Sequence, residues 1–165
     1  MSHVNSFAGV ILAAGESSRM GTDKALLPWP PRPPGAGSLV KNRLKGISKV
    51  GLLATTGTIQ AGLFQTSFSH RGLQLIIPSP EVQKKWVMEA IYGRRGIKAI
   101  GPSENSKRLI LNASEELIHR GAQAIIAGCT EVPLVLKEKD LSVPVIDPIS
   151  ILAGAAIEKA QGRKK

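Results

Sequence analysis

Cysteine and aromatic residues are both scarce in this sequence of 165 residues, and each shortage excludes a class of function. The single cysteine, Cys129, can form neither an internal disulfide nor a cysteine-rich metal cluster. Aromatic residues make up 4% of the chain, which argues against a surface that stacks the bases of single-stranded nucleic acid. The three histidines show no metal-ligand spacing, and no apolar run approaches the roughly 20 residues that span a bilayer. We therefore expect no metal site and no membrane association.

Positive charge is present in excess, but it is scattered. The chain has 22 Lys and Arg against 12 Asp and Glu, a formal net charge of +10. The basic residues occur in short pairs such as Lys84 and Lys85, which favours a solvated basic surface over a nucleic-acid partner. The apolar stretch 7–14 lacks the basic segment and the cleavage site of a signal peptide, so we expect a cytoplasmic protein.

Proline is concentrated in one place. Positions 28, 30, 31, 33 and 34 are all proline, and Gly-Ala-Gly follows at 35–37. Neither a helix interior nor a central strand tolerates this density, so the segment is expected to be an extended connector. The sequence is thus predicted to divide into an N-terminal fragment with its linker, 1–37, and a folded lobe, 38–165.

Apolar segments alternate with helical patterns in the second part of the chain. Strands are predicted at 49–54, 73–77, 123–128 and 143–146. Helices are predicted at 38–47, 79–92 and 103–121, and from 147 onward. This alternation predicts an α/β fold, with an open, mostly parallel sheet flanked by helices. Ligands of such sheets bind at the carboxyl ends of the strands.

Cys129 follows one of these predicted strands. Backbone N–H groups and a helix dipole at this point would bring the thiol pKa down from about 8.5 toward neutral. A thiol of that kind suits proton transfer or nucleophilic catalysis. The alternative is a buried cysteine that acts as a small apolar side chain. Thr130 and Glu131, which come next, favour a functional site.

Thr55 and Thr58 follow another predicted strand in the same way. Their hydroxyls and the nearby backbone amides could cradle a carboxylate or a phosphate, or could simply cap a helix. Lys98 comes after a glycine-rich break and is either a second contact for an anion or a solvated surface residue.

Four motifs together resemble the aspartate/glutamate racemase family, from about residue 49 to the end of the chain. They lie at 52–58, at 90–92 with 96–98, at 128–136 and at 143–148. The resemblance implies one of two similar α/β lobes with the active site between them, and catalysis without pyridoxal phosphate or another cofactor. It matches Cys129 to the acid/base cysteine of the second lobe. It also matches Thr55, Thr58 and Thr130 to positions around the substrate carboxylate, and Lys98 to a lysine near the side-chain carboxylate. A small dicarboxylic amino acid is the implied ligand.

The cysteine motif of the family's first lobe has no counterpart in this sequence. One cysteine can exchange a proton at one face, but inversion needs a group on each face. We therefore expect this chain by itself to racemise very slowly. One alternative is protonation at a single face, as in the superfamily's decarboxylases or isomerases of malonate-like acids. Another is a non-catalytic remnant, or a half that works as a homo-oligomer or with a complementary lobe.

The N-terminal fragment carries a resemblance of its own. Residues 8–27 are similar to the opening of nucleotidyltransferases that act on sugar phosphates and molybdenum cofactors. The resemblance implies that Gly15, Arg19 and Lys24 contact the phosphates of a nucleotide. Nothing later in the chain supplies the base pocket or the metal-binding aspartate of those enzymes, so nucleotide binding is the second, less favoured function.

Overall fold

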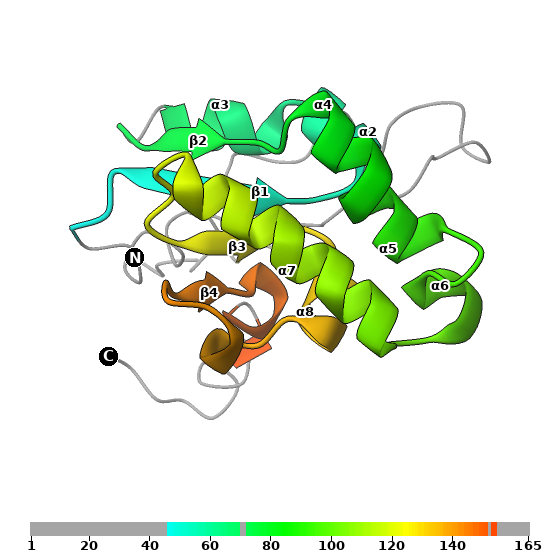
Figure 1. Ribbon diagram of the computed structural model, residues 1–165. Helices are drawn as coiled ribbons and strands as arrows, with labels where there is room; N and C mark the ends of the chain where they lie inside the picture. The colour runs from blue at the N-terminus through cyan, green and yellow to red at the C-terminus, as the bar shows by residue number, and fades with distance from the viewer. Residues whose placement is uncertain (1–45, 70–71, 152, 155–165) are drawn as a thin grey trace, which may run out of the picture.

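A four-stranded parallel sheet forms the centre of the protein. The computed structural model describes residues 46–69, 72–151 and 153–154. The strands are β1 (Lys49–Leu53), β2 (Gln74–Ile76), β3 (Ile125–Ala127) and β4 (Val145–Ile146), and their order across the sheet is β2-β1-β3-β4 (Figure 1). Every neighbouring pair runs parallel. The predicted α/β fold is therefore confirmed, and all four predicted strands are present in shortened form.

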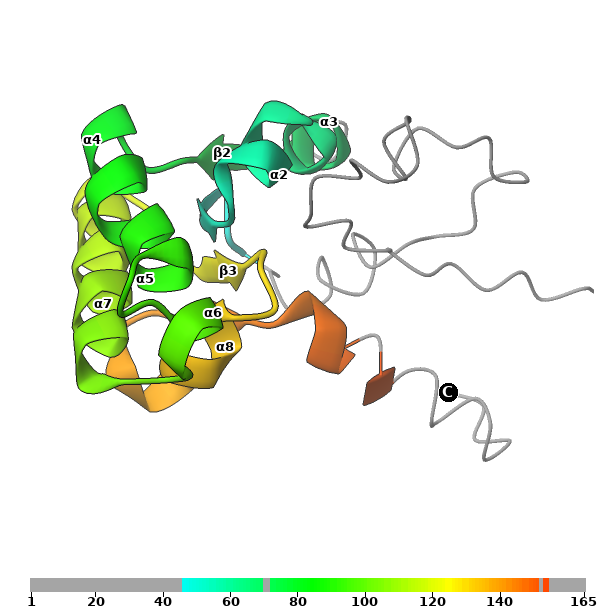
Figure 2. The same ribbon diagram turned by 90° about the vertical axis from the view of Figure 1, so that its right-hand side faces the viewer.

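Side chains of the two central strands alternate between two apolar cores. On β1, Val50 and Leu52 belong to one core and Leu53 to the other, and Ile126 and Ile125 divide in the same way on β3. All five side chains are fully buried. Strands that are apolar on both faces are typical of a parallel sheet covered by helices on both sides. Figure 2 shows this layered arrangement with the sheet between the helices.

The helices on one face of the sheet begin where the sequence predicts. Ser79 caps the helix that runs through α4 (Pro80–Val82), η2 (Gln83–Met88) and α5 (Glu89–Tyr92). Ser103 and Ser106 form a reciprocal cap at the start of α7 (Glu104–His119). Two short helices, α6 (Ile97–Ile100) and α8 (Val132–Val135), lie beside them, and a single 3₁₀ turn, η3, spans Glu138–Asp140.

The opposite face carries two helices outside the predicted helical ranges, although helix capping by the threonines after β1 was one of the alternatives considered for them. These are α2 (Thr56–Gln60) and α3 (Leu63–Ser69), with Ile59 and Phe68 packed in the second core. The last predicted helix is present at 148–151 and 153–154, where the Asp147 carboxylate accepts the Ile149 N–H, and its continuation lies outside the described residues. The predicted helix 38–47 also lies mostly outside them, and positions 46 and 47 are not helical. The division at residue 37 stays a prediction. In 46–69, 72–151 and 153–154 there is no helix with the length and apolarity to cross a membrane.

Gly51 lets α7 approach the centre of the sheet. A Cβ atom at this position would lie 2.8 Å from Ile125 Cδ1 and 3.1 Å from Leu117 Cβ. Carbon atoms that are not bonded normally stay about 3.5–4.0 Å apart. A larger residue would therefore push Ile125 and Leu117 aside where β1 passes beneath α7.

We predict that Gly51→Ala lowers the free energy of unfolding by about 1–3 kcal/mol, because the added methyl group overpacks the core. Gly57→Ala is the matched control, since a Cβ there would have no atom within 4 Å. In α2, that replacement is expected to stabilise the protein by about 0.5–1 kcal/mol. Urea unfolding measures both effects. Equal stability of Gly51→Ala and the unchanged protein would contradict the close packing of α7 on β1.

Candidate functional site

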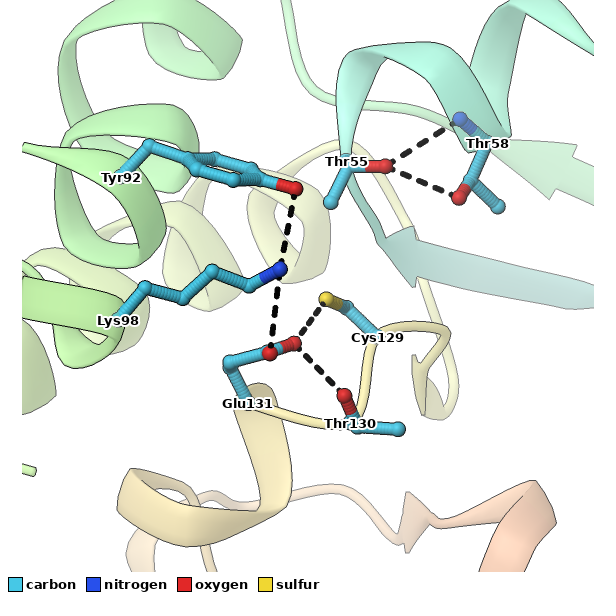
Figure 3. Close-up of polar contacts among 7 residues, drawn as sticks. All are labelled: Thr55, Thr58, Tyr92, Lys98, Cys129, Thr130 and Glu131. Carbon is cyan, nitrogen blue, oxygen red and sulfur yellow. Dashed lines mark hydrogen bonds and ion pairs between the residues drawn. The ribbon is translucent and has the colours of Figure 1, made fainter. Parts of the chain in front are cut away.

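Thr55 and Cys129 leave the sheet at the same edge. In the parallel pair of β1 and β3, Leu53 lies opposite Ala127. Thr55 and Cys129 come two residues after these partners, so both stand at the carboxyl ends of adjacent strands. Figure 3 shows their side chains around a common space, with Tyr92 and Lys98 on its other side. The structure thus brings residues of four separate segments to the place where α/β sheets bind ligands.

Gly128 fixes the position of Cys129. A Cβ on Gly128 would lie 2.6 Å from Leu52 Cδ1 and 3.3 Å from the carbonyl oxygen of Leu53. The Gly128 N–H donates a hydrogen bond of 2.8 Å to that same carbonyl. A larger residue would lift the backbone off β1 and displace the cysteine that follows, which is 1% exposed.

Glu131 is the centre of the polar network at this edge. Its Oε2 accepts hydrogen bonds from Cys129 Sγ, at 2.7 Å, and from Thr130 Oγ1, at 2.8 Å. Its Oε1 lies 3.5 Å from Lys98 Nζ. The Glu131 side chain is 16% exposed, so these three partners enclose most of the carboxylate (Figure 3).

These contacts keep a proton on the sulfur. Burial raises the pKa of Cys129, and the hydrogen bond to Glu131 raises it further, to about 12. Burial acts to raise the pKa of Glu131 as well, but hydrogen bonds from Cys129 and Thr130 bring it below its ordinary value. At neutral pH, the pair is therefore a thiol beside a carboxylate.

The prediction of a cysteine pKa close to neutral is therefore wrong. It assumed that Cys129 stands at the start of a helix whose dipole favours a thiolate. Instead, α8 begins at Val132 and is four residues long, and the Glu131 carboxylate lies between that helix and the sulfur. Burial and a neighbouring negative charge both disfavour the thiolate, and together they outweigh one helical turn.

Lys98 supplies the positive charge of the network. It lies in α6, and its Nζ donates a hydrogen bond of 3.3 Å to the hydroxyl of Tyr92 and lies 4.6 Å from the centre of that ring. Burial acts to lower the pKa of Lys98, but Tyr92 and the Glu131 carboxylate raise it above its ordinary value. The ammonium group is therefore charged at neutral pH. Its side chain is 38% exposed, so a solvent-borne anion can reach it.

Thr55 and Thr58 bind each other. Thr55 Oγ1 lies 3.0 Å from Thr58 Oγ1 and accepts the Thr58 backbone N–H at 3.3 Å. Both side chains are buried, and Thr55 is the N-cap of α2. The capping role that the sequence left open is therefore present. Contact with an anion stays a prediction for these two residues.

Glu131 and Tyr92 were not among the predicted site residues. Glu131 follows Cys129 and Thr130 directly, and a carboxylate in that place could have been recognised as a partner for the thiol. Tyr92 ends the motif at 90–92, but no role was predicted for it, because its contact with Lys98 depends on how α5 and α6 pack. Gly15, Arg19 and Lys24 lie outside the described residues, and their phosphate contacts stay a prediction.

A pocket of about 480 Å³ lies elsewhere, against α4 and the end of α7. None of the predicted site residues lines it; its walls are Ile59, Ile77, Pro78, Ser79, Pro80, Gln83, Glu116 and Arg120. Throughout the described part of the chain, no group of three or more His, Cys, Asp and Glu residues could hold a metal ion.

A protein-family model matches most of this chain. Residues 36–156 match the model of the Asp/Glu/Hydantoin racemase family, which is well over half of the chain. The chain belongs to the Asp/Glu/hydantoin racemase family.

Solved structures related to this racemase-family chain share its fold. A candidate Asp/Glu racemase from Yersinia pestis is 32% identical, with a TM-score of 0.65 over 76% of this chain and 54% of its own. The aspartate racemase of Picrophilus torridus is 26% identical, with a TM-score of 0.62 over 78% of this chain and 51% of its own. A curated relative, an uncharacterized protein in the pnlA 3′ region of Pectobacterium carotovorum subsp. carotovorum, is 32% identical over 59% of this chain and 61% of itself. The predicted racemase-type lobe is confirmed as a fold, and this chain spans about half the length of the solved relatives.

A second, much shorter similarity concerns another kind of protein. A stretch of 27 residues is 70% identical to the molybdenum cofactor guanylyltransferase of Xanthomonas euvesicatoria pv. vesicatoria. It covers 16% of this chain and 14% of that enzyme. The likeness to a nucleotidyltransferase therefore rests on a short segment alone.

We predict that Glu131→Gln makes Cys129 more reactive toward iodoacetamide between pH 7 and 9. Removing the carboxylate lowers the pKa of Cys129, and each unit of decrease raises the thiolate fraction about tenfold. Since Cys129 is the only cysteine in the sequence, mass spectrometry of the alkylated protein reports on it alone. Glu138→Gln, at an exposed position of η3, is the control. Slower alkylation of Glu131→Gln than of the control would contradict the assignment of the proton to the sulfur.

Proposed function

We propose that this chain binds a small dicarboxylic amino acid of the aspartate or glutamate type and that Cys129 exchanges its α-proton at one face. The observation that carries the proposal is the Cys129–Glu131 hydrogen bond at the carboxyl ends of β1 and β3, in a chain of the racemase family. The acid and the base of this reaction are side chains, and no cofactor takes part in it.

The protonation state of Cys129 determines whether it donates a proton or removes one more readily. With a pKa of about 12, Cys129 is a thiol at neutral pH and can give its proton to an α-carbanion. In that step, the S–H bond breaks, a C–H bond forms and a thiolate remains. Proton removal needs that thiolate, which is a fraction of roughly 10⁻⁵ at pH 7. The Lys98 ammonium favours the thiolate and Glu131 opposes it, so exchange is expected to be slow.

Recognition of the acid is assigned to the rest of the cluster. Lys98 keeps its charge and part of its side chain faces solvent, which supports a contact with the side-chain carboxylate. Thr130 is exposed, and together with Thr55 and Thr58 we assign it to the α-carboxylate end of the ligand. To bind an anion, the threonine hydroxyls would have to give up part of their present contact with one another.

Inversion of the α-carbon requires a second group on the opposite face. Cys129 is the only cysteine in the sequence, so that group would come from a further lobe or another polypeptide. Tyr92, Ile100 and Leu134, from α5, α6 and α8, are large apolar side chains that are about half exposed, and Tyr92 contacts Lys98 of the site. They support a proposal that a second lobe, from another copy or a complementary chain, covers the site. A cytoplasmic location remains our expectation.

Protonation of a malonate-like acid is the second candidate function. A thiol with a pKa of about 12 remains protonated across the neutral range, which suits delivery of one proton to one face. Loss of carbon dioxide would leave the carbanion, Cys129 would supply the proton and water would restore the thiol. One cysteine is sufficient for this sequence of steps.

For the N-terminal segment, we keep a separate proposal. Gly15, Arg19 and Lys24 would hold the phosphates of a nucleotide, as the similarity to nucleotidyltransferases suggests. The support is a 27-residue match, so this activity ranks below the amino-acid chemistry.

We predict slow exchange of the α-hydrogen of L-aspartate in deuterium oxide, followed by proton NMR. The rate is expected to rise about tenfold per pH unit between pH 7 and 9, because the thiolate fraction rises in that proportion below the pKa. Chiral chromatography should show D-aspartate forming much more slowly than deuterium is incorporated. Cys129→Ser should abolish exchange, whereas replacement of the exposed Lys84 by alanine should leave it unchanged. Racemisation as fast as exchange would contradict chemistry at a single face.

For the second candidate, we predict release of carbon dioxide from phenylmalonate at a rate that is constant between pH 6 and 9. The thiol is the active form in this case, and it persists well below a pKa of about 12. The measurement is gas evolution, with Cys129→Ser as the inactive comparison. No release above that of the variant would remove this candidate. A rate that is constant with pH also separates decarboxylation from α-hydrogen exchange, whose rate is expected to rise with pH.

A further inference from the structure

A π-helical segment, η2 (Gln83–Met88), interrupts the helix from Pro80 to Tyr92. In an α-helix of 3.6 residues per turn, side chains five positions apart point about 140° away from each other. In a π-helix, hydrogen bonds join residues five apart, so Gln83 and Met88 stand on one side of the helix. π-helical turns are rare in proteins, and those that occur are often found at functional sites. The contacts of Gln83 and Met88 are therefore of interest.

Both side chains hold the turn that follows β1. Gln83 Nε2 donates to the carbonyl oxygen of Ala54 at 3.0 Å and lies 3.3 Å from Thr56 Oγ1. Met88 Sδ accepts the backbone N–H of Thr56 at 3.4 Å. Ala54 is fully buried and Gln83 is 9% exposed, so these contacts are largely shielded from water.

We infer that the π turn fixes residues 54–56 and thereby aims the hydroxyl of Thr55, which makes Gln83 and Met88 positioning residues of the site. Thr55 lies between the two residues that they hold. The inference rests on the proposed role of Thr55 in binding the acid, and it adds residues that no motif indicated.

The helix from Pro80 to Tyr92 also contacts Lys98, on the opposite side of the site. It ends at Tyr92, whose hydroxyl accepts the hydrogen bond from Lys98. One continuous helix therefore carries the side chains that hold the threonine turn and the side chain that holds the lysine. The distance between the two proposed anion contacts is thus set by a single rigid element.

The test compares Met88→Leu and Gln83→Met with Lys84→Ala. Met88→Leu removes the sulfur acceptor and keeps the volume, which protects the fold, and Gln83→Met removes the amide donor. Lys84 lies in the same π segment and is exposed, so its replacement is the matched control. The first measurement is amide hydrogen exchange by NMR. We expect exchange at least tenfold faster for the Thr56 and Thr58 amides in both site variants, with Ile126 of β3 and all amides of the control unchanged.

The second measurement is the dependence of α-hydrogen exchange on aspartate concentration. A misaimed Thr55 should raise the half-saturating concentration five- to tenfold, with less than a twofold change in the maximal rate. A merely structural role would instead lower the melting temperature and affect both constants equally. Unchanged exchange of the Thr56 amide in Met88→Leu would overturn the inference and leave the proposed function intact. If the unaltered protein does not act on aspartate, the proposed function fails, and the amide measurement still decides whether the π turn holds residues 54–56.

Discussion

The parallel pairing of β1 with β3 is the constraint on which the rest of the structure depends. It joins the two strands whose side chains fill both cores, and its register places the residues after Leu53 and Ala127 at one edge. Two glycines make the close contacts of this pair feasible, Gly51 beneath α7 and Gly128 over β1. A shift of one residue in this register would turn Cys129 away from the site and exchange the two cores.

Within the site, the important question is whether the sulfur of Cys129 or the carboxylate of Glu131 carries the proton. A carboxylate that accepts two hydrogen bonds and faces an ammonium group is stabilised as an anion, and that anion in turn keeps the thiol protonated. The group that strengthens the network thus makes Cys129 a weaker base. A ligand carboxylate that drew Lys98 away from Glu131 would alter this balance. In the proposed reaction, binding and proton transfer would therefore be coupled through one lysine.

The sequence predicted the architecture well because the relevant patterns are local. Runs such as Ala124–Ala127 are apolar throughout, and Ser79 and Ser103 mark helix starts by their own chemistry. The helices α2 and α3 were missed because they are short and lack a clear apolar period. The pKa of Cys129 was predicted in the wrong direction because it depends on burial and on the orientation of Glu131. The π turn was not predicted from the sequence, because the turn that Gln83 and Met88 contact lies about 30 positions away in the chain.

The strand order also has a consequence for how the polypeptide reaches its native state during synthesis. Ser48 binds the side chain of Gln123, 75 positions further on, and β1 gains its second neighbour only when that region has left the ribosome. Until then, the edge of β1 that pairs with β3 has no partner strand. Such long-range closure is slow and leaves nascent chains prone to aggregation. Folding is therefore expected to be completed late, and Cys129, which lies beyond β3, becomes enclosed only at that stage.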